Sequence, residues 1–207
     1  MNTHFDPLML DIPREVKGER IVLRAYEDAD ADALWEAIDT SRAHLSTWMP
    51  WVKDHNDLEY TRVYIRRMQA KWILREDFVM GIWSRENESL LGATGFHRID
   101  WSVPSLEIGY WVCADAEGQG YVTEAVKLIT RFAFRFFHAE RVTIMCSSKN
   151  ARSAAVPRRA GFMHEATLRC ERRELDGTLR DTELFAMTRA DFESLSLSDV
   201  ENQNFPE

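Results

Sequence analysis

Apolar and polar residues follow two distinct periodicities along this chain. Runs that alternate, or that are short and mostly apolar, predict seven strands over residues 19–26, 77–84, 90–99, 105–113, 141–147, 164–175 and 178–188. Helical spacing predicts four helices over residues 28–45, 57–74, 123–137 and 150–162. The expected order is one strand, two helices, three strands, a helix, a strand, a helix and two strands. This order predicts a mixed α/β sheet with helices on its faces.

The two ends of the chain differ from this regular interior. Residues 1–17 read as an arm that packs on the core, and residues 193–207 are polar and acidic, which is typical of a fraying tail. The stretch between them, residues 18–192, has a length that suits a single compact domain. We therefore expect one domain flanked by two short extensions.

Charge and cysteine content narrow the class of protein. The net charge of −8 argues against bulk binding to nucleic acid or to acidic membranes, which depends on Lys and Arg. No apolar run reaches membrane-spanning length, and the first residues lack a signal-peptide pattern. Three cysteines without CxxC spacing favour neither a disulfide framework nor a zinc site, so we expect no metal. These features indicate a cytoplasmic protein.

The segment EGQGYVTEA joins the strand over 105–113 to the helix over 123–137. Glycines at 118 and 120 let the backbone approach a ligand closely, and the following helix start offers free N–H groups and a positive dipole end. Such a junction suits a pyrophosphate. It is neither a Walker loop nor a dinucleotide fingerprint, because the required Gly-Lys-Ser/Thr and third glycine are absent. Taken alone, this pattern is more typical of a plain turn.

Further motifs in a consistent order change that interpretation. EGQGYV (117–122) follows IGYWVCADA (108–116), and downstream lies NARSAAVPRRAGF (150–162). The remaining matching segments are GFHRID (95–100), LEIGYWV (106–112), TEAV (123–126), WMPW (48–51) and LRDTELFAM (179–187). Together they span roughly residues 18–190, and the chain resembles the GNAT N-acetyltransferase superfamily, in its branch of RimJ/RimL-type ribosomal-protein N-acetyltransferases. The resemblance implies a mostly antiparallel sheet that splays between the fourth and fifth predicted strands, with helices on both faces.

The resemblance also implies a cofactor and the residues that bind it. The cofactor is acetyl-CoA, which leaves as CoA after direct attack of an amine in a ternary complex. By resemblance, the pantetheine arm pairs with Trp111, Val112 and Cys113, and Asn150 contacts the same arm. The phosphates would lie on backbone N–H groups of the loop and helix start, namely Gly118, Gln119, Gly120, Tyr121, Val122 and Thr123. Ser153 would protonate the departing thiolate.

The general base and the acceptor site are less sharply defined. Glu107 flanks the expected site, and Glu171 lies in the penultimate strand, where this branch has a catalytic glutamate; each could equally be a salt-bridged strand carboxylate. His97 could be a base, a substrate contact or a strand histidine bonded to its neighbours. Trp48 and Trp51 flank Met-Pro in a loop, so they line either an acceptor pocket or a subunit contact. A homodimer is therefore one expectation.

Three residues depart from the family pattern. Glu117 stands where the family has Gln or Arg, so a carboxylate lies near the expected phosphates. Val122 replaces a small residue but keeps its backbone N–H. Pro157 lies inside the expected helix over 150–162, where it removes the hydrogen bond to the carbonyl of Ser153. We expect that helix to bend or tighten near Ser153.

The resemblance implies N-acetylation of an amine. The first expectation for the acceptor is the α-amine of a protein or peptide, because an α-amine with a pKa of about 8 is partly neutral near pH 7 and needs only modest base catalysis. A small amine or an aminoacyl-nucleotide antibiotic is the alternative acceptor. A degenerate CoA-binding module without turnover is the alternative from another class, prompted by the three departures at residues 117, 122 and 157.

Overall fold

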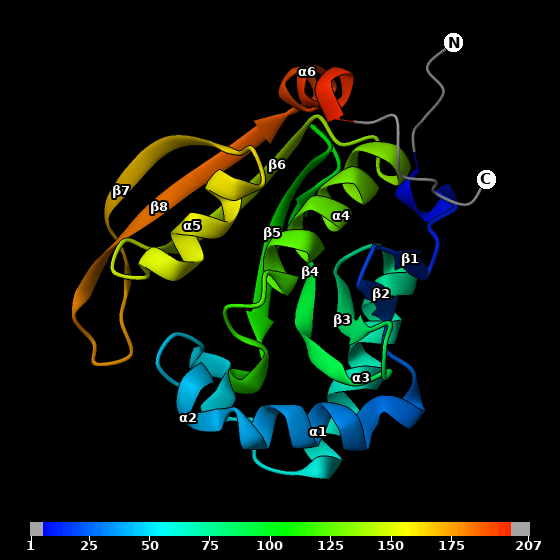
Figure 1. Ribbon diagram of the computed structural model, residues 1–207, viewed down its shortest axis with the longest axis vertical. Coiled ribbons are helices and arrows are strands. Elements are labelled where there is room, and N and C mark those ends of the chain that lie inside the picture. The colour runs from blue at the N-terminus through cyan, green and yellow to red at the C-terminus, as the bar shows by residue number, and fades with distance from the viewer. Residues whose placement is uncertain (1–5, 200–207) are drawn as a thin grey trace.

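The computed structural model describes residues 6–199, with side chains through residue 195 (Figure 1). The strands are β1 (Glu15–Lys17), β2 (Ile21–Ala25), β3 (Phe78–Ser84), β4 (Leu90–Asp100), β5 (Ser105–Val112), β6 (Arg141–Ser147), β7 (Met163–Arg173) and β8 (Leu179–Thr188). The α-helices are α1 (Ala31–Thr40), α2 (Arg42–Leu45), α3 (Leu58–Leu74), α4 (Tyr121–Phe136), α5 (Ala151–Arg159) and α6 (Arg189–Asp199). Short 3₁₀ turns are η1 (Pro7–Met9), η2 (Asp28–Asp30), η3 (Pro50–Lys53) and η4 (Ala114–Ala116).

All eight strands of the described range join one sheet in the order β1-β2-β3-β4-β5-β6-β8-β7. Every neighbouring pair is antiparallel except β5 and β6, which are parallel. Pairing between β5 and β6 ends at Ile108 and Ile144, although β5 continues to Val112 and β6 to Ser147. The sheet therefore opens into a wedge between these two strands, which confirms the predicted mixed, mostly antiparallel and splayed sheet.

Helices cover both faces of the sheet. On one face α4 lies across β4 and β5 (Figure 1), and its apolar stripe enters the main core, where Phe132 and Phe137, the residue after the helix, contact Phe96. On the other face α1 and α3 pack together over a second cluster that includes Leu34, Ile65 and Trp83. None of the described helices is both long and apolar enough to cross a membrane.

The structure differs from the sequence expectations at three places. The arm contributes the short strand β1, whose Val16 is buried against the core. The helix expected over 28–45 is divided into η2, α1 and α2, because Ser41 leaves the helical conformation between the last two. Residues 1–5 lie outside the described range.

The third difference concerns the tail. Residues 193–199, expected to be a polar extension, belong to helix α6. The side chain of Asp191 accepts hydrogen bonds from the backbone N–H and hydroxyl of Thr188, at 2.9 Å and 2.6 Å. Phe192 stacks on Phe134 with ring centroids 4.5 Å apart. These contacts anchor a segment whose polar composition had suggested fraying; the rest of that tail, residues 200–207, lies outside the described range.

Candidate active site

Two cavities flank the wedge between β5 and β6. The first has a volume of about 950 Å³ and lies between β5, α4 and α5. The second has a volume of about 460 Å³ and lies between β5, the segment 48–64 and the β7–β8 hairpin. Six residues line both: Trp48, Met49, Tyr110, Trp111, Asn150 and Ser153. The two cavities thus share a boundary, which the free end of β5 and the start of α5 form.

The loop before α4 has the geometry that an anion site requires. Gly118 and Gly120 have φ angles of +73° and +85°, which residues with a Cβ rarely adopt. Helix α4 begins at Tyr121, and the first hydrogen bond at its start joins the N–H of Glu124 to the carbonyl of Gly120 at 3.1 Å. The N–H groups of residues 121–123 therefore have no partner within the helix, and these residues line the first cavity.

Arg20 holds this loop in place from a distant part of the chain. Its guanidinium donates to the carbonyl of Gln119 at 3.0 Å and to Glu124 at 2.9 Å, and it lies over the ring of Tyr121. The backbone N–H of Arg20 adds a second bond to Glu124 at 2.8 Å. Sequence reasoning missed Arg20, because nothing near position 20 indicates contact with a loop about a hundred residues away.

The carboxylate of Glu117 is paired. Arg152, in the first turn of α5, donates to both oxygens of Glu117 at 2.8 Å and 2.9 Å, and the ring of His44 lies 3.7 Å from the same group. All three residues line the first cavity. The charge at position 117 that the sequence placed near the phosphates is thus balanced locally. Arg152, which lines the first cavity, was also missed by sequence reasoning.

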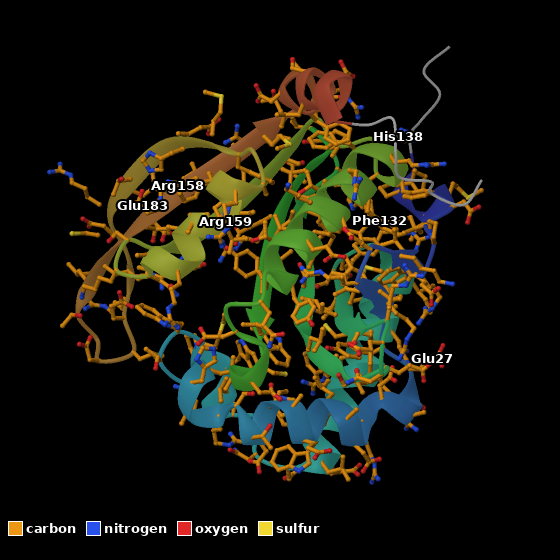
Figure 2. The ribbon with its side chains drawn as sticks, in the orientation of Figure 1. Glu27, Phe132, His138, Arg158, Arg159 and Glu183 are labelled. Carbon is orange, nitrogen blue, oxygen red and sulfur yellow. The ribbon has the colours of Figure 1, made fainter. Side chains whose placement is uncertain are left out.

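Helix α5 carries Asn150 and Ser153 to the boundary between the cavities. The side chain of Asn150 caps the helix by accepting from the N–H of Ser153 at 3.0 Å. Figure 2 shows Arg159 on the side of α5 that faces α4, where it donates to Thr123 at 3.3 Å, and Arg158 toward the hairpin, where it lies over Phe185. Contacts on both sides therefore fix the rotation of this short helix.

Pro157 does not interrupt α5, which is continuous from Ala151 to Arg159. The carbonyl of Ser153, deprived of its helical donor by Pro157, accepts a hydrogen bond from the hydroxyl of Tyr110 at 3.0 Å. The same hydroxyl lies 3.1 Å from the Oγ of Ser153. Burial raises the pKa of Tyr110, so this phenol stays a neutral donor. Tyr110 thus compensates for the proline and positions the serine hydroxyl.

Aromatic side chains dominate the second cavity. Its rings are Tyr26, Trp48, Trp51, Tyr60, Tyr64, Tyr110 and Trp111, with His55 and His97. The rings of Trp51 and Trp111 lie 6.1 Å apart, so the loop over 48–51 reaches the strand that borders the wedge. The structure brings the three predicted acceptor residues, Trp48, Trp51 and His97, to one cavity.

His55 forms the inner wall of this cavity and is buried. Its Nε2 lies 2.7 Å from the hydroxyl of Thr61, and its ring stacks on Trp35. Burial, followed by the nearby charge of Arg42, lowers the pKa of His55 to about 4. The aromatic end of the cavity is therefore uncharged near neutral pH.

The two candidate carboxylate bases line neither cavity. Glu107 accepts from Arg98 at 2.7 Å. Glu171 accepts from Thr182 and Arg172; burial works to raise the pKa of Glu171, but these hydrogen bonds outweigh it and lower the pKa. His97 lines the second cavity with its Nδ1 held 3.0 Å from Asp77, and its other ring edge faces Gly109, where no Cβ intervenes. Among the three, His97 alone lines one of the two cavities.

Most of the expected cofactor residues line the first cavity, and two do not. Gln119 turns its amide toward the carbonyl of Asp115 at 2.9 Å. Cys113 is buried, its N–H bonds the carbonyl of Leu91 at 2.8 Å, and burial raises the pKa of its thiol to about 11. The lining includes the other expected residues: Trp111, Val112, Gly118, Gly120, Tyr121, Val122, Thr123, Asn150 and Ser153.

Comparison with known families agrees with this geometry. Residues 20–163 match the family model described as the acetyltransferase (GNAT) domain. The chain belongs to the GNAT acetyltransferase family. As the sequence had indicated, it is an acetyltransferase, and the wedge beside β5 is where the two cavities of this GNAT domain meet.

Individual relatives are similar over most of their length. The ribosomal-protein-serine acetyltransferase of Escherichia coli is 24% identical over 170 residues, which are 82% of this chain and 93% of the relative. The structure of RimL, the ribosomal L7/L12 α-N-protein acetyltransferase in complex with coenzyme A, has a TM-score of 0.76 at 24% identity and covers 86% of this chain and 97% of its own. The microcin C7 self-immunity acetyltransferase MccE, in complex with acetyl-CoA and AMP, has a TM-score of 0.77 at 22% identity and covers 83% and 93%.

Proposed function

We propose that this GNAT enzyme transfers an acetyl group from acetyl-CoA to the α-amine of a protein or peptide. The observation that carries the proposal is the shared boundary of the two cavities at Tyr110 and Ser153. A donor in the larger cavity and an amine in the smaller one would meet at the free end of β5. The names of the E. coli relative and of RimL, both ribosomal-protein acetyltransferases, support a protein acceptor.

The larger cavity fits the cofactor in three respects. Its volume of about 950 Å³ falls at the upper end of the range for pockets that enclose small molecules. The N–H groups at the start of α4 and the glycine loop would hold the phosphates. The end of β5 that β6 leaves unpaired, from residue 109 to residue 112, would pair with the pantetheine arm. When bound, acetyl-CoA supplies an activated acetyl thioester.

The residues of the chain would then direct the transfer. The amine nitrogen would attack the acetyl carbon, and the carbon–sulfur bond would break. Ser153 would donate a proton to the leaving sulfur and regain one from solvent, to which His97 would return the proton that it takes from the amine. Tyr110 fixes the position of the Ser153 hydroxyl. His97, oriented by Asp77 from the acceptor side, accepts the proton that the amine loses. A backbone N–H at the free end of β5 stabilises the negative charge that develops on the acetyl oxygen.

A second class of acceptor follows from the aromatic walls of the smaller cavity. Stacked rings suit a planar group such as a nucleobase, so a small amine that bears one is the alternative. MccE, whose structure holds AMP beside acetyl-CoA, has the same fold. One reason to consider a CoA-binding module without turnover was the charge of Glu117 near the expected phosphates. That reason is weaker because Arg152 forms an ion pair with Glu117.

Acetyl transfer to a panel of acceptors tests the proposal. Purified enzyme with labelled acetyl-CoA should modify the N-termini of peptides or of proteins in a cell extract, identified by mass spectrometry. Modification of amine-bearing nucleosides alone would move the function to the alternative acceptor. Tight acetyl-CoA binding in calorimetry without turnover on any amine would overturn the proposal in favour of a binding module.

A further inference from the structure

We call the larger cavity, proposed to hold acetyl-CoA, the donor cavity, and the smaller cavity, proposed to hold the amine, the acceptor cavity. The permanently charged side chains that line the acceptor cavity are all arginines. Arg172, Arg173 and Arg180 approach it from the β7–β8 hairpin, and no aspartate or glutamate is among the residues that line it. The histidine on its inner wall, His55, is neutral near pH 7, because its pKa is lowered to about 4. The cavity therefore has an uncharged aromatic end and a cationic end.

The arrangement of these arginines is unfavourable for the hairpin alone. Arg172 and Arg180 are cross-strand partners in the antiparallel pair of β7 and β8. Like charges at opposed positions of neighbouring strands destabilise a hairpin. Glu171, which accepts from Arg172, and Glu174, 3.9 Å from Arg180, offset part of this repulsion, and an anion held at Arg180 would offset more of it.

Carboxylates on the hairpin leave part of this charge unmatched. Arg172 donates to Glu171 at 3.0 Å, whereas Arg180 is 3.9 Å from Glu174, whose other oxygen already accepts from Ser147. The Nε of Arg180 is buried and has no hydrogen-bond partner within the described residues. Arg173 donates to the carbonyl of Gly177 at 2.7 Å and pairs with no carboxylate in that range. Donors of two arginines thus remain for a ligand.

We propose that the acceptor cavity selects amines that also carry an anionic group, a carboxylate or a phosphate, held by Arg173 and Arg180. This inference rests on the proposed N-acetylation. The apolar part of the acceptor would lie against the aromatic end, the anion against the hairpin, and the amine at the free end of β5. The same positive field disfavours the ammonium form of the acceptor, which promotes the neutral amine that reacts.

Pairs of acceptors that differ in the presence of an anionic group test this selectivity. One arm uses peptides of equal length with N-terminal Ser-Asp-Glu or Ser-Asn-Gln; the other uses an aminoacyl-nucleoside and its 5′-phosphate. We expect kcat/KM for the anionic member of at least one pair to exceed that of its neutral partner about tenfold, as a charged hydrogen bond of this kind allows, and the ratio to fall with added salt. The arm with the larger ratio identifies whether the anion is a carboxylate or a phosphate.

Substitutions in the hairpin test which arginines cause the preference for anionic acceptors. Arg173→Ala and Arg180→Lys should each reduce, several-fold, the ratio of kcat/KM for the anionic acceptor to kcat/KM for its neutral partner. Arg173→Glu should reverse the preference toward a peptide with lysine at its second position. Arg169→Ala is the matched control, because Arg169 is exposed on the same strand and does not line the cavity.

Two outcomes would overturn the inference while the proposed function stands. One is equal kcat/KM for anionic and neutral acceptors with the native enzyme. The other is a loss in the arginine variants that is equal for both acceptors, which would indicate a structural role of the hairpin. Absence of turnover with every acceptor would instead contradict the proposed function.

Discussion

The donor cavity and the acceptor cavity share a boundary but are built differently. The donor cavity depends on backbone groups from consecutive residues, chiefly the glycine loop and the first turn of α4. The acceptor cavity depends on residues from several separate parts of the chain: Tyr26 after β2, α1, the segment 48–64, β3, β4, β5, β6, α5 and the hairpin. In the proposed function, the cofactor would be held mainly by a compact motif and the acceptor by dispersed side chains.

This difference teaches where variation is tolerated. Backbone N–H groups persist under most substitutions, so Glu117 and Val122 depart from the family pattern without removing the phosphate geometry. A side chain, in contrast, loses its contacts when it is substituted. A change at a single ring or arginine of the acceptor cavity alters the shape and charge that the acceptor meets.

The largest expected effect lies at the shared boundary. Ser153→Ala should lower kcat by ~100- to 10,000-fold, because general acid catalysis typically contributes that much, while acetyl-CoA affinity stays nearly unchanged. Single-turnover kinetics and calorimetry measure the two quantities. Asn150→Ala should instead weaken acetyl-CoA binding, by roughly 1–3 kcal/mol if a buried partner is left unpaired. Full kcat in the Ser153 variant would show that its hydroxyl takes no part in the proton transfer.

Acid should affect the acceptor side. The pKa of His55 is about 4 in the folded protein against 6.5 as a model value, so the unfolded chain binds the proton first as pH falls. The contribution of neutral His55 to the free energy of unfolding is therefore fully present above pH 6.5. It decreases by up to ~3 kcal/mol as pH falls to 4. Urea unfolding across this range should show a shallower slope for His55→Gln than for the native protein. His138→Gln, at an exposed position, is the control and should keep the native slope.

The link between Tyr110 and Pro157 is testable by a double-mutant cycle. Tyr110→Phe leaves the carbonyl of Ser153 without a donor, at a cost of about 1–3 kcal/mol in the free energy of unfolding. Pro157→Ala restores an N–H that can bond this carbonyl. The cost of Tyr110→Phe should therefore shrink by ~1 kcal/mol in the Pro157→Ala background. Identical costs in both backgrounds would rule out the compensation.

The smallest effect concerns the ion pair in the lining of the donor cavity. The side chain of Arg152 is 82% exposed, so its bond to Glu117 contributes at most about 1 kcal/mol. Glu117→Gln should release Arg152 toward the phosphates and raise acetyl-CoA affinity up to about fivefold at low salt, less at high salt. Arg152→Ala should change affinity in the opposite direction. An unchanged affinity in both variants would separate this pair from cofactor binding.

The sequence indicated the glycine loop of the donor cavity, whereas contacts between distant parts of the chain were not visible in it. Gly118, Gly120 and the strand and helix around them are neighbours in the chain, so their pattern is visible locally. Arg20, Arg152 and the pair formed by Tyr110 and Pro157 depend on tertiary contacts, which no local periodicity encodes. Their discovery required the fold.

The position of the β7–β8 hairpin has a consequence for redesign. It lies at the end of the strand order, with β7 outermost, and the Asp176-Gly177 turn that joins its strands is exposed. Only β8 pairs with the rest of the sheet, through β6. A hairpin from another GNAT enzyme could therefore be grafted distal to Glu183 and Thr167 while the inner register is retained. Exchange of this one element would replace the cationic end of the acceptor cavity and leave the glycine loop and the start of α4 unchanged.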